Sequence, residues 1–156
     1  MRPLLPLIAS AAALVACAGE SPPRELQGLW GQGPAACDAG IGVTFAAGAV
    51  QAHYADDTQT LLDQPRYALE RRGERVRVEI SYRLPRPPGA GHVSARGELL
   101  LERGADGWLH TVSHRITDAR TGAARVSLGA DPVSATFRLR RCGPDAWIAG
   151  LRGRDA

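Results

Sequence analysis

Alternation of apolar and polar residues is the main pattern of this chain after its first sixteen residues. The clearest case is residues 75–83 (RVRVEISYR), where the apolar side chains share one face and polar or charged side chains occupy the other. A period of two residues is typical of a β-strand with one buried face. No stretch shows a convincing period of 3.6 residues, so the pattern predicts an all-β protein.

Eight or nine such strands can be placed along the sequence. They are expected at residues 26–31, 41–45, 50–54, 67–71, 75–83, 94–102, 108–117, 124–128 and 133–140. Most are separated by short glycine-containing turns, such as Arg72-Gly73 and Thr121-Gly122, of the kind that joins antiparallel neighbours. So many hairpins in about 120 residues predict a small antiparallel up-and-down barrel of about eight strands, with a two-sheet β-sandwich as the alternative.

The first sixteen residues have a different pattern. Arg2 supplies one positive charge, and residues 4–16 are apolar apart from Pro6 and Ser10, which is typical of a secretory signal peptide. As a helix this run would span about 20 Å, which is short of the ~30 Å hydrocarbon core of a bilayer. A permanent membrane span is therefore not expected here.

The leader ends in Leu14-Val15-Ala16-Cys17, which resembles the lipobox of bacterial lipoproteins. The resemblance implies cleavage before Cys17, a diacylglycerol on its thiol and a further acyl group on the new amine. Two or more acyl chains anchor a protein stably to a membrane. In enteric bacteria an Asp after this Cys retains lipoproteins in the inner membrane, so Ala18 favours the outer membrane, facing the periplasm. The alternative is a buried apolar cysteine in an N-terminal helix.

The sequence divides into four parts on this interpretation. Residues 1–16 are the signal peptide, 17–25 the lipidated cysteine with a tether, 26–150 one barrel-like domain and 151–156 a C-terminal tail. Removing Arg2 from the 19 basic residues leaves 18 against 16 acidic ones, a side-chain balance of +2. No nucleic-acid partner is expected from so small a balance.

Two cysteines, Cys37 and Cys142, remain after Cys17. In an oxidising compartment they are expected to form a disulfide, and two free buried thiols are the alternative. Cys37 follows the first predicted strand and Cys142 ends the last, so a bridge would place the two ends of the domain side by side. In a closed barrel the first and last strands are neighbours, although a sandwich could satisfy the same bridge.

Gly28-Leu29-Trp30 resembles the Gly-x-Trp motif of the lipocalin and calycin barrels. The resemblance implies that Trp30 closes one end of the barrel and packs under an Arg from the last strand. Alternation places Arg141 on the same face as Phe137 and Leu139, so Arg141 is the candidate to stack on Trp30. The alternative is that Trp30 is an ordinary core residue.

Motifs of catalysis are missing from the sequence. There is no Gly-x-Ser-x-Gly elbow, no phosphate-binding loop and no His-Glu-x-x-His. His110 and His114 have the spacing of a helical zinc pair, but on the predicted strand this spacing separates them by about 13 Å, so no metal site is expected. We therefore expect no catalytic residues and no cofactor.

The expected function is that of a lipid-anchored envelope protein whose non-catalytic barrel binds a small or lipidic ligand. The alternative is a protein-interaction or hydrolase-inhibitor module, with a filled barrel and an exposed apolar patch or a projecting loop at residues 85–92. An enzyme without a recognisable motif is a third possibility. Arg outnumbers Glu in residues 66–86, which predicts either a face for anionic headgroups or peptidoglycan, or an ordinary solvated strand face.

Overall fold

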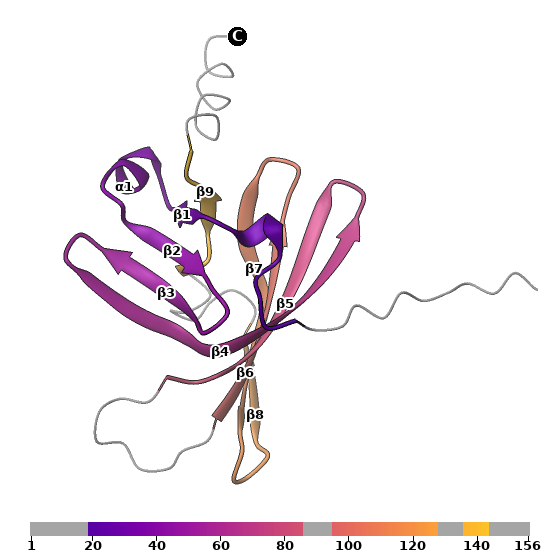
Figure 1. Cartoon of the computed structure of the whole chain (residues 1–156). Helices are drawn as coiled ribbons and strands as arrows, with labels where there is room; N and C mark the ends of the chain where they lie inside the picture. Colours follow the sequence, from indigo (N-terminus) through magenta and orange to yellow (C-terminus); the bar gives the residue numbers. More distant parts are fainter. Residues whose placement is uncertain (1–18, 86–94, 128–135, 144–156) are drawn as a thin grey trace, which may run out of the picture.

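The computed structural model describes residues 19–85, 95–127 and 136–143, and these residues form an all-β domain (Figure 1). Its strands are β1 (Leu29–Gly31), β2 (Gly42–Phe45), β3 (Ala49–Tyr54), β4 (Asp57–Arg72), β5 (Arg75–Arg83), β6 (Ala95–Arg103), β7 (Trp108–Asp118), β8 (Ala124–Ser127) and β9 (Leu139–Arg141). A short 3-10 helix, η1 (Arg24–Leu26), precedes β1, and a five-residue α-helix, α1 (Pro34–Asp38), follows it.

All the described strands belong to one antiparallel sheet that closes on itself. The order is β6-β5-β4-β3-β2-β1-β9-β7-β8, and β6 also pairs with β7. Eight strands therefore form a ring, in which β9 lies between β1 and β7 (Figure 1). Strand β8 is outside the ring, paired with the second half of β7. The predicted antiparallel barrel is confirmed, and the sandwich alternative is wrong.

Strand β5 shows how the sequence builds this barrel. Its buried and exposed positions alternate along the whole strand, with Val76, Val78, Ile80 and Tyr82 inside, as the pattern predicts. The inward side chains of the other ring strands join them in one apolar cluster. Burying a large apolar side chain contributes about 1.5 to 3 kcal/mol, so this cluster is the main source of stability.

Aromatic rings fill the part of the core nearest β1. The ring of Trp30 meets Phe45 edge-on at a centroid distance of 6.5 Å, and Phe45 meets Phe137 at 6.1 Å. Trp30 and Phe137 are fully buried. Rings of this size occupy much of the inner space of an eight-stranded barrel, which is wide enough for little more than its own side chains.

The predicted strand at residues 133–140 is much shorter in the structure. Residues 133–135 lie outside the described residues, Thr136 is helical, Phe137 lies in a turn, and pairing covers only Leu139–Arg141. Alternation predicts which side chains are buried and does not by itself fix the backbone conformation. The side chain of Phe137 is buried although its backbone lies in a turn. For Phe137 and Leu139 the pattern was therefore right about burial, and for Phe137 it was wrong about backbone conformation.

Strand β4 is longer than predicted and is bent. The sequence predicts a strand at residues 67–71, whereas β4 begins at Asp57. Its register shifts between Asp63 and Arg66, and Gln64 has a φ of 47°, a left-handed conformation that few residues other than glycine adopt. The backbone N–H of Gln64 donates to the carbonyl oxygen of Gly48 at 3.0 Å, which holds the bend against the β2–β3 turn.

The two ends of the barrel domain are joined by the predicted disulfide between Cys37 and Cys142. Cys37 lies in α1, and Cys142 directly follows β9; their Cα atoms are 5.5 Å apart across 105 positions of sequence. The backbone N–H of Cys142 also donates to the carbonyl oxygen of Leu29 at 2.7 Å. The disulfide therefore pins β9 beside β1, where the ring closes.

We predict that the double substitution Cys37→Ala/Cys142→Ala lowers the free energy of unfolding by about 4 to 5 kcal/mol, because the bridge restricts a loop of this length in the unfolded chain. Denaturant titration of the oxidised protein and of the variant measures the difference. Reduction of the unsubstituted protein should give a similar loss. Equal unfolding midpoints with and without a reductant would contradict the prediction.

Candidate functional site

The N-terminal segment is held on the free edge of β4. Strand β3 pairs with β4 only as far as Asp63, so Tyr67, which is opposite Ile80 of β5 on one side, has no strand partner on the side of β3. Gly19 supplies one: its N–H donates to the carbonyl oxygen of Tyr67 at 2.9 Å, and it accepts from the Tyr67 N–H at 2.8 Å. Gly19 is thus paired with the barrel, although it lies inside the segment for which the sequence predicts a tether.

Side chains strengthen this contact. Glu20 forms an ion pair of 3.3 Å with Arg66, and Glu25 forms an ion pair with Arg71. Leu26 is buried in the barrel core. Cys17, the predicted lipidation site, lies just outside the described residues, two positions before Gly19.

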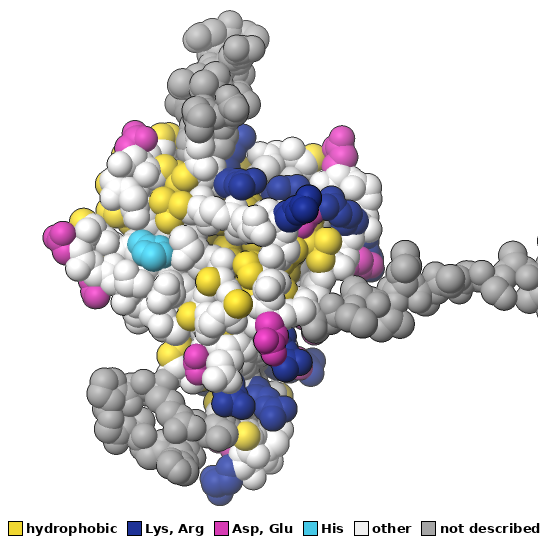
Figure 2. All heavy atoms as spheres, in the orientation of Figure 1, with side chains coloured by type: hydrophobic (Ala, Val, Ile, Leu, Met, Phe, Trp, Pro, Cys, Tyr) yellow, Lys and Arg dark blue, Asp and Glu magenta, His cyan; other side chains and the backbone are white. Residues whose placement is uncertain are grey.

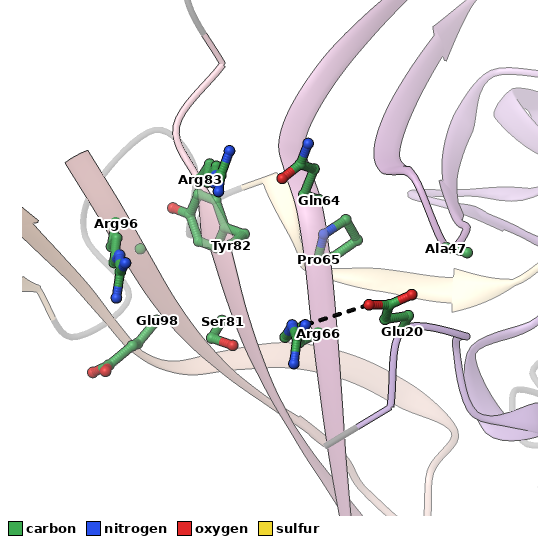
Figure 3. A pocket seen from close by; sticks show the side chains of 11 residues that line it. Glu20, Ala47, Gln64, Pro65, Arg66, Ser81, Tyr82, Arg83, Arg96 and Glu98 are labelled. Carbon is green, nitrogen blue, oxygen red and sulfur yellow. Dashed lines mark hydrogen bonds and ion pairs between the residues drawn. The ribbon is translucent and has the colours of Figure 1, made fainter. Parts of the chain in front are cut away.

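A surface pocket of about 500 Å³ opens beside Glu20, where β4 bends (Figure 3). The β2–β3 turn and the walls of β4, β5 and β6 surround it. Its charged lining consists of three arginines and two glutamates: Arg66, Arg83, Arg96, Glu20 and Glu98. All five side chains are exposed, so the pocket belongs to the outer wall of the barrel and not to its interior.

Strand register decides how these charges are arranged. One row across the wall places Glu98 opposite Ser81 on β5 and Arg115 on β7, and Glu98 forms an ion pair of 3.8 Å with Arg115. The next row places Arg83 between Asp63 on β4 and Arg96 on β6. Among the described residues, neither of these two arginines has an ion-pair partner within 4 Å.

Arginines at the other end of β5 are all paired. Arg71 pairs with Glu25 and Arg72 with Glu70. Arg77 donates from Nε to Glu102 at 2.7 Å, and Arg75 lies 3.6 Å from the same carboxylate. The hydrogen bond from Arg77 lowers the pKa of Glu102, with the charges of Arg77 and Arg75 adding to the effect. The arginine-rich stretch therefore has acidic neighbours at both ends, because at the first end Arg66 is paired with Glu20 and Arg83 lies opposite Asp63.

The inner side of the same wall holds a buried polar pair. The hydroxyl oxygen of Tyr82 and Nε2 of His114 are 2.6 Å apart, and the two rings stack with a centroid distance of 6.1 Å. Gly97 lies opposite Tyr82, and a Cβ atom at this position would overlap the tyrosine ring. The glycine therefore makes room for the hydrogen bond between Tyr82 and His114.

The two histidines of the helical zinc spacing lie on opposite faces of β7. The register between β6 and β7 shifts between Leu100 and Leu101, and this bulge reverses the side from which later residues project. His110 is exposed opposite Glu102, whereas His114 is 2% exposed. The two histidines, expected about 13 Å apart on one face, thus project from opposite faces of the sheet. No group of three potential metal ligands occurs among the described residues.

Three residues of the Gly-x-Trp resemblance meet at the end of the barrel that the disulfide closes. Trp30 pairs directly with Arg141 across β1 and β9. The guanidinium of Arg141 lies over Gly28, where an added Cβ would come within 3.4 Å of its Nε. The indole N–H of Trp30 donates to the carbonyl oxygen of Leu26 at 3.0 Å. The juxtaposition fits the predicted packing of Trp30 with Arg141, and a stack of the two groups stays a prediction.

Comparison with protein-family models, with curated proteins and with solved structures finds no match for this chain. Within the described ranges, no helix has the length and apolar character needed to cross a bilayer.

Tyr82→Phe is predicted to destabilise the fold by about 1 to 3 kcal/mol, because it removes a hydrogen-bond partner from buried His114. Tyr54, which is 51% exposed, offers a matched control: Tyr54→Phe should change the free energy of unfolding by less than about 0.5 kcal/mol. Urea denaturation measures both. Equal effects of the two substitutions would show that the buried hydrogen bond contributes nothing.

Glu102→Gln is predicted to weaken the dependence of stability on acid pH. The lowered pKa of Glu102 in the folded state means that its ionised form stabilises the fold above the ordinary glutamate pKa, and that this contribution is lost as pH falls through the lowered pKa. At pH 7 the variant should be less stable by up to about 1 kcal/mol, and the two proteins should converge at low pH. Exposed Glu74 supplies the control Glu74→Gln. A constant difference between the Glu102→Gln variant and the unsubstituted protein at every pH would contradict this assignment.

Proposed function

We propose that this protein is a lipid-anchored protein of the cell envelope and that its barrel is a non-catalytic interaction module. We choose an interaction module because the interior of the barrel is occupied. Inward side chains of the ring strands, including Trp30, Phe45 and Phe137, pack together in one buried cluster. This favours a filled barrel that works through its outer surface over a barrel that encloses a ligand.

The lipid anchor is supported by two independent features. Residues 1–17 have the charge, the apolar run and the terminal cysteine of a lipoprotein leader. The disulfide between Cys37 and Cys142 fits an exported protein, because such bonds persist in oxidising compartments. We place the protein at the outer membrane, facing the periplasm, with the membrane as its first partner and another envelope protein as the second.

A second candidate function is the binding of a small or lipidic ligand on the outer wall. The pocket beside Glu20 has a volume of about 500 Å³, which falls within the range of known ligand sites. Its lining has three arginines and two glutamates, a side-chain balance of +1, which would slightly favour a ligand with negative charge.

Mass spectrometry of the intact protein extracted from membranes tests the anchor. We predict a mature chain that begins at Cys17, carries acyl groups and is lighter by the two hydrogens lost at the disulfide. Under native conditions it should retain no ligand if the filled barrel is an interaction module, whereas a retained anionic molecule would favour the second candidate.

The substitution Cys17→Ser should leave the leader uncleaved and abolish acylation, because serine lacks the thiol that receives the lipid. The matched control is Cys37→Ser/Cys142→Ser, which removes two thiols but should leave acylation at Cys17 intact. An unmodified Cys17 in the membrane-extracted protein, or acylation that persists in the Cys17→Ser variant, would refute the anchor.

A further inference from the structure

A small apolar pocket opens on the surface beside α1. Its volume is about 170 Å³, and its lining comes from α1, β2, β3 and the start of β9. Val43, Ala52 and Leu139 of this lining are buried, while Ala36 and Ile41 are half-buried. Sites for small-molecule ligands usually have at least about 300 Å³. The pocket is therefore better suited to one apolar side chain than to a whole ligand.

An exposed aromatic ring belongs to the same pocket. Tyr54, the last residue of β3, lines the pocket and is 51% exposed. Among the described residues, only Val126 is a second large apolar side chain with such exposure. Tyrosine rings and well-packed apolar pockets are where the binding energy of protein interfaces concentrates. The pocket with its ring thus has the composition of a contact site for another protein.

Carboxylates flank this pocket. Between Glu25 and Asp63 the chain has five acidic residues and no Arg or Lys. Asp38 ends α1, and Asp56 and Asp57 follow Tyr54 at the β3–β4 turn, so two of the elements that line the pocket are next to acidic groups. All three are exposed, and none has an ion-pair partner within 4 Å in the part of the chain that the structure describes. The pocket, Tyr54 and these three carboxylates are called the docking face below.

Figure 2 shows the same separation of charge. On the left of the view, over α1, β2 and β3, yellow and magenta side chains are visible without dark blue, which gathers over other parts of the surface. Exposed Arg138 borders the docking face, because it directly precedes Leu139 of β9. Arg140 extends towards Gly107 and Arg141 lies over Gly28. The docking face is therefore acidic although the whole chain is basic.

From these observations we propose that the docking face binds a segment of a partner protein that carries one apolar side chain beside Arg or Lys. The apolar side chain would enter the pocket and contact Tyr54, and the basic groups would meet the carboxylates of Asp38, Asp56 and Asp57. Complementary charge of this kind steers association and selects against partners of the wrong charge. The inference rests on the proposed function as an interaction module and assigns the place where the module binds.

NMR spectra of the full protein, extracted in detergent with labelled isoleucine methyl groups, test the proposal. The probes are three peptides with blocked ends: Arg-Phe-Arg, Arg-Ala-Arg and Glu-Phe-Glu. The methyl signal of Ile41 reports on the pocket, and that of Ile80, which is fully buried in the core, is the control.

We expect Arg-Phe-Arg to shift the Ile41 signal and to leave the Ile80 signal unchanged. It should bind at least about tenfold more tightly than Arg-Ala-Arg, because only phenylalanine fills the pocket. It should also bind about threefold to fivefold more tightly than Glu-Phe-Glu, because exposed ion pairs contribute modestly. High salt should remove the second difference and keep the first.

Variants add a second readout. Ala36→Leu fills the pocket from α1 and should abolish the shift of Ile41 by Arg-Phe-Arg. Asp56→Asn/Asp57→Asn should reduce the preference for Arg-Phe-Arg over Glu-Phe-Glu. The matched control Glu74→Gln/Glu79→Gln removes two exposed carboxylates near the β4–β5 turn and should leave this preference unchanged. The comparison of peptides uses the unsubstituted protein, so it stands even where a variant folds poorly.

Each outcome separates the docking face from the anchor. Equal binding of Arg-Phe-Arg and Arg-Ala-Arg, or no shift of Ile41, overturns the docking face even where Cys17 carries acyl chains. Equal binding of Glu-Phe-Glu and Arg-Phe-Arg overturns the basic partner. A shift of Ile41 that grows with protein concentration alone indicates a second copy of the chain and also overturns the proposal. Selective binding of Arg-Phe-Arg by a protein without acyl chains supports the docking face and refutes the anchor.

Discussion

Closure of the ring by β9 is the constraint on which the rest of this barrel depends. This strand pairs through only two residues with β1 and two with β7. So few ladder positions contribute little by themselves. The disulfide at Cys142, its hydrogen bond to Leu29 and the buried side chains of Phe137 and Leu139 hold β9 in place. Without β9, β1 and β7 would each have an unpaired backbone edge, and the core between them would be exposed.

The fold could be predicted from the sequence where one face of a strand is buried along its whole length. Strand β5 occupies residues 75–83, as its alternation predicts. Prediction failed at Phe137, whose side chain is buried although its backbone lies in a turn and not in a strand. It also failed in β4, which continues through a bend at Gln64 that no periodic pattern indicates. The short helix α1 was missed because five residues are too few to show a period.

The candidate site could be predicted only in its composition. The sequence shows an excess of arginine on alternating strand positions, but their partners depend on register. A single bulge in β7 places His110 outside and His114 inside, and the pairing of β5 with β6 sets Arg83 opposite Arg96. The backbone pairing of Gly19 has no sequence signal, because it depends on where β3 leaves the edge of β4 free.

The barrel fold does not by itself determine which charged residues occupy the outer wall. The neighbouring row accepts a glutamate at Glu98, and at the other end of β5 the carboxylate of Glu102 lies between β5 and β7 and binds two arginines. In the row that follows, Arg83 lies between Asp63 on β4 and Arg96 on β6, so it has an acidic neighbour on one side and a basic one on the other. Because aromatic rings occupy the interior, we propose that the outer surface carries the function. Around the bend of β4 that surface carries charges of both signs, with Arg66, Arg83 and Arg96 beside Glu20, Asp63 and Glu98, so a partner that binds there would have to match a mixed pattern of charge.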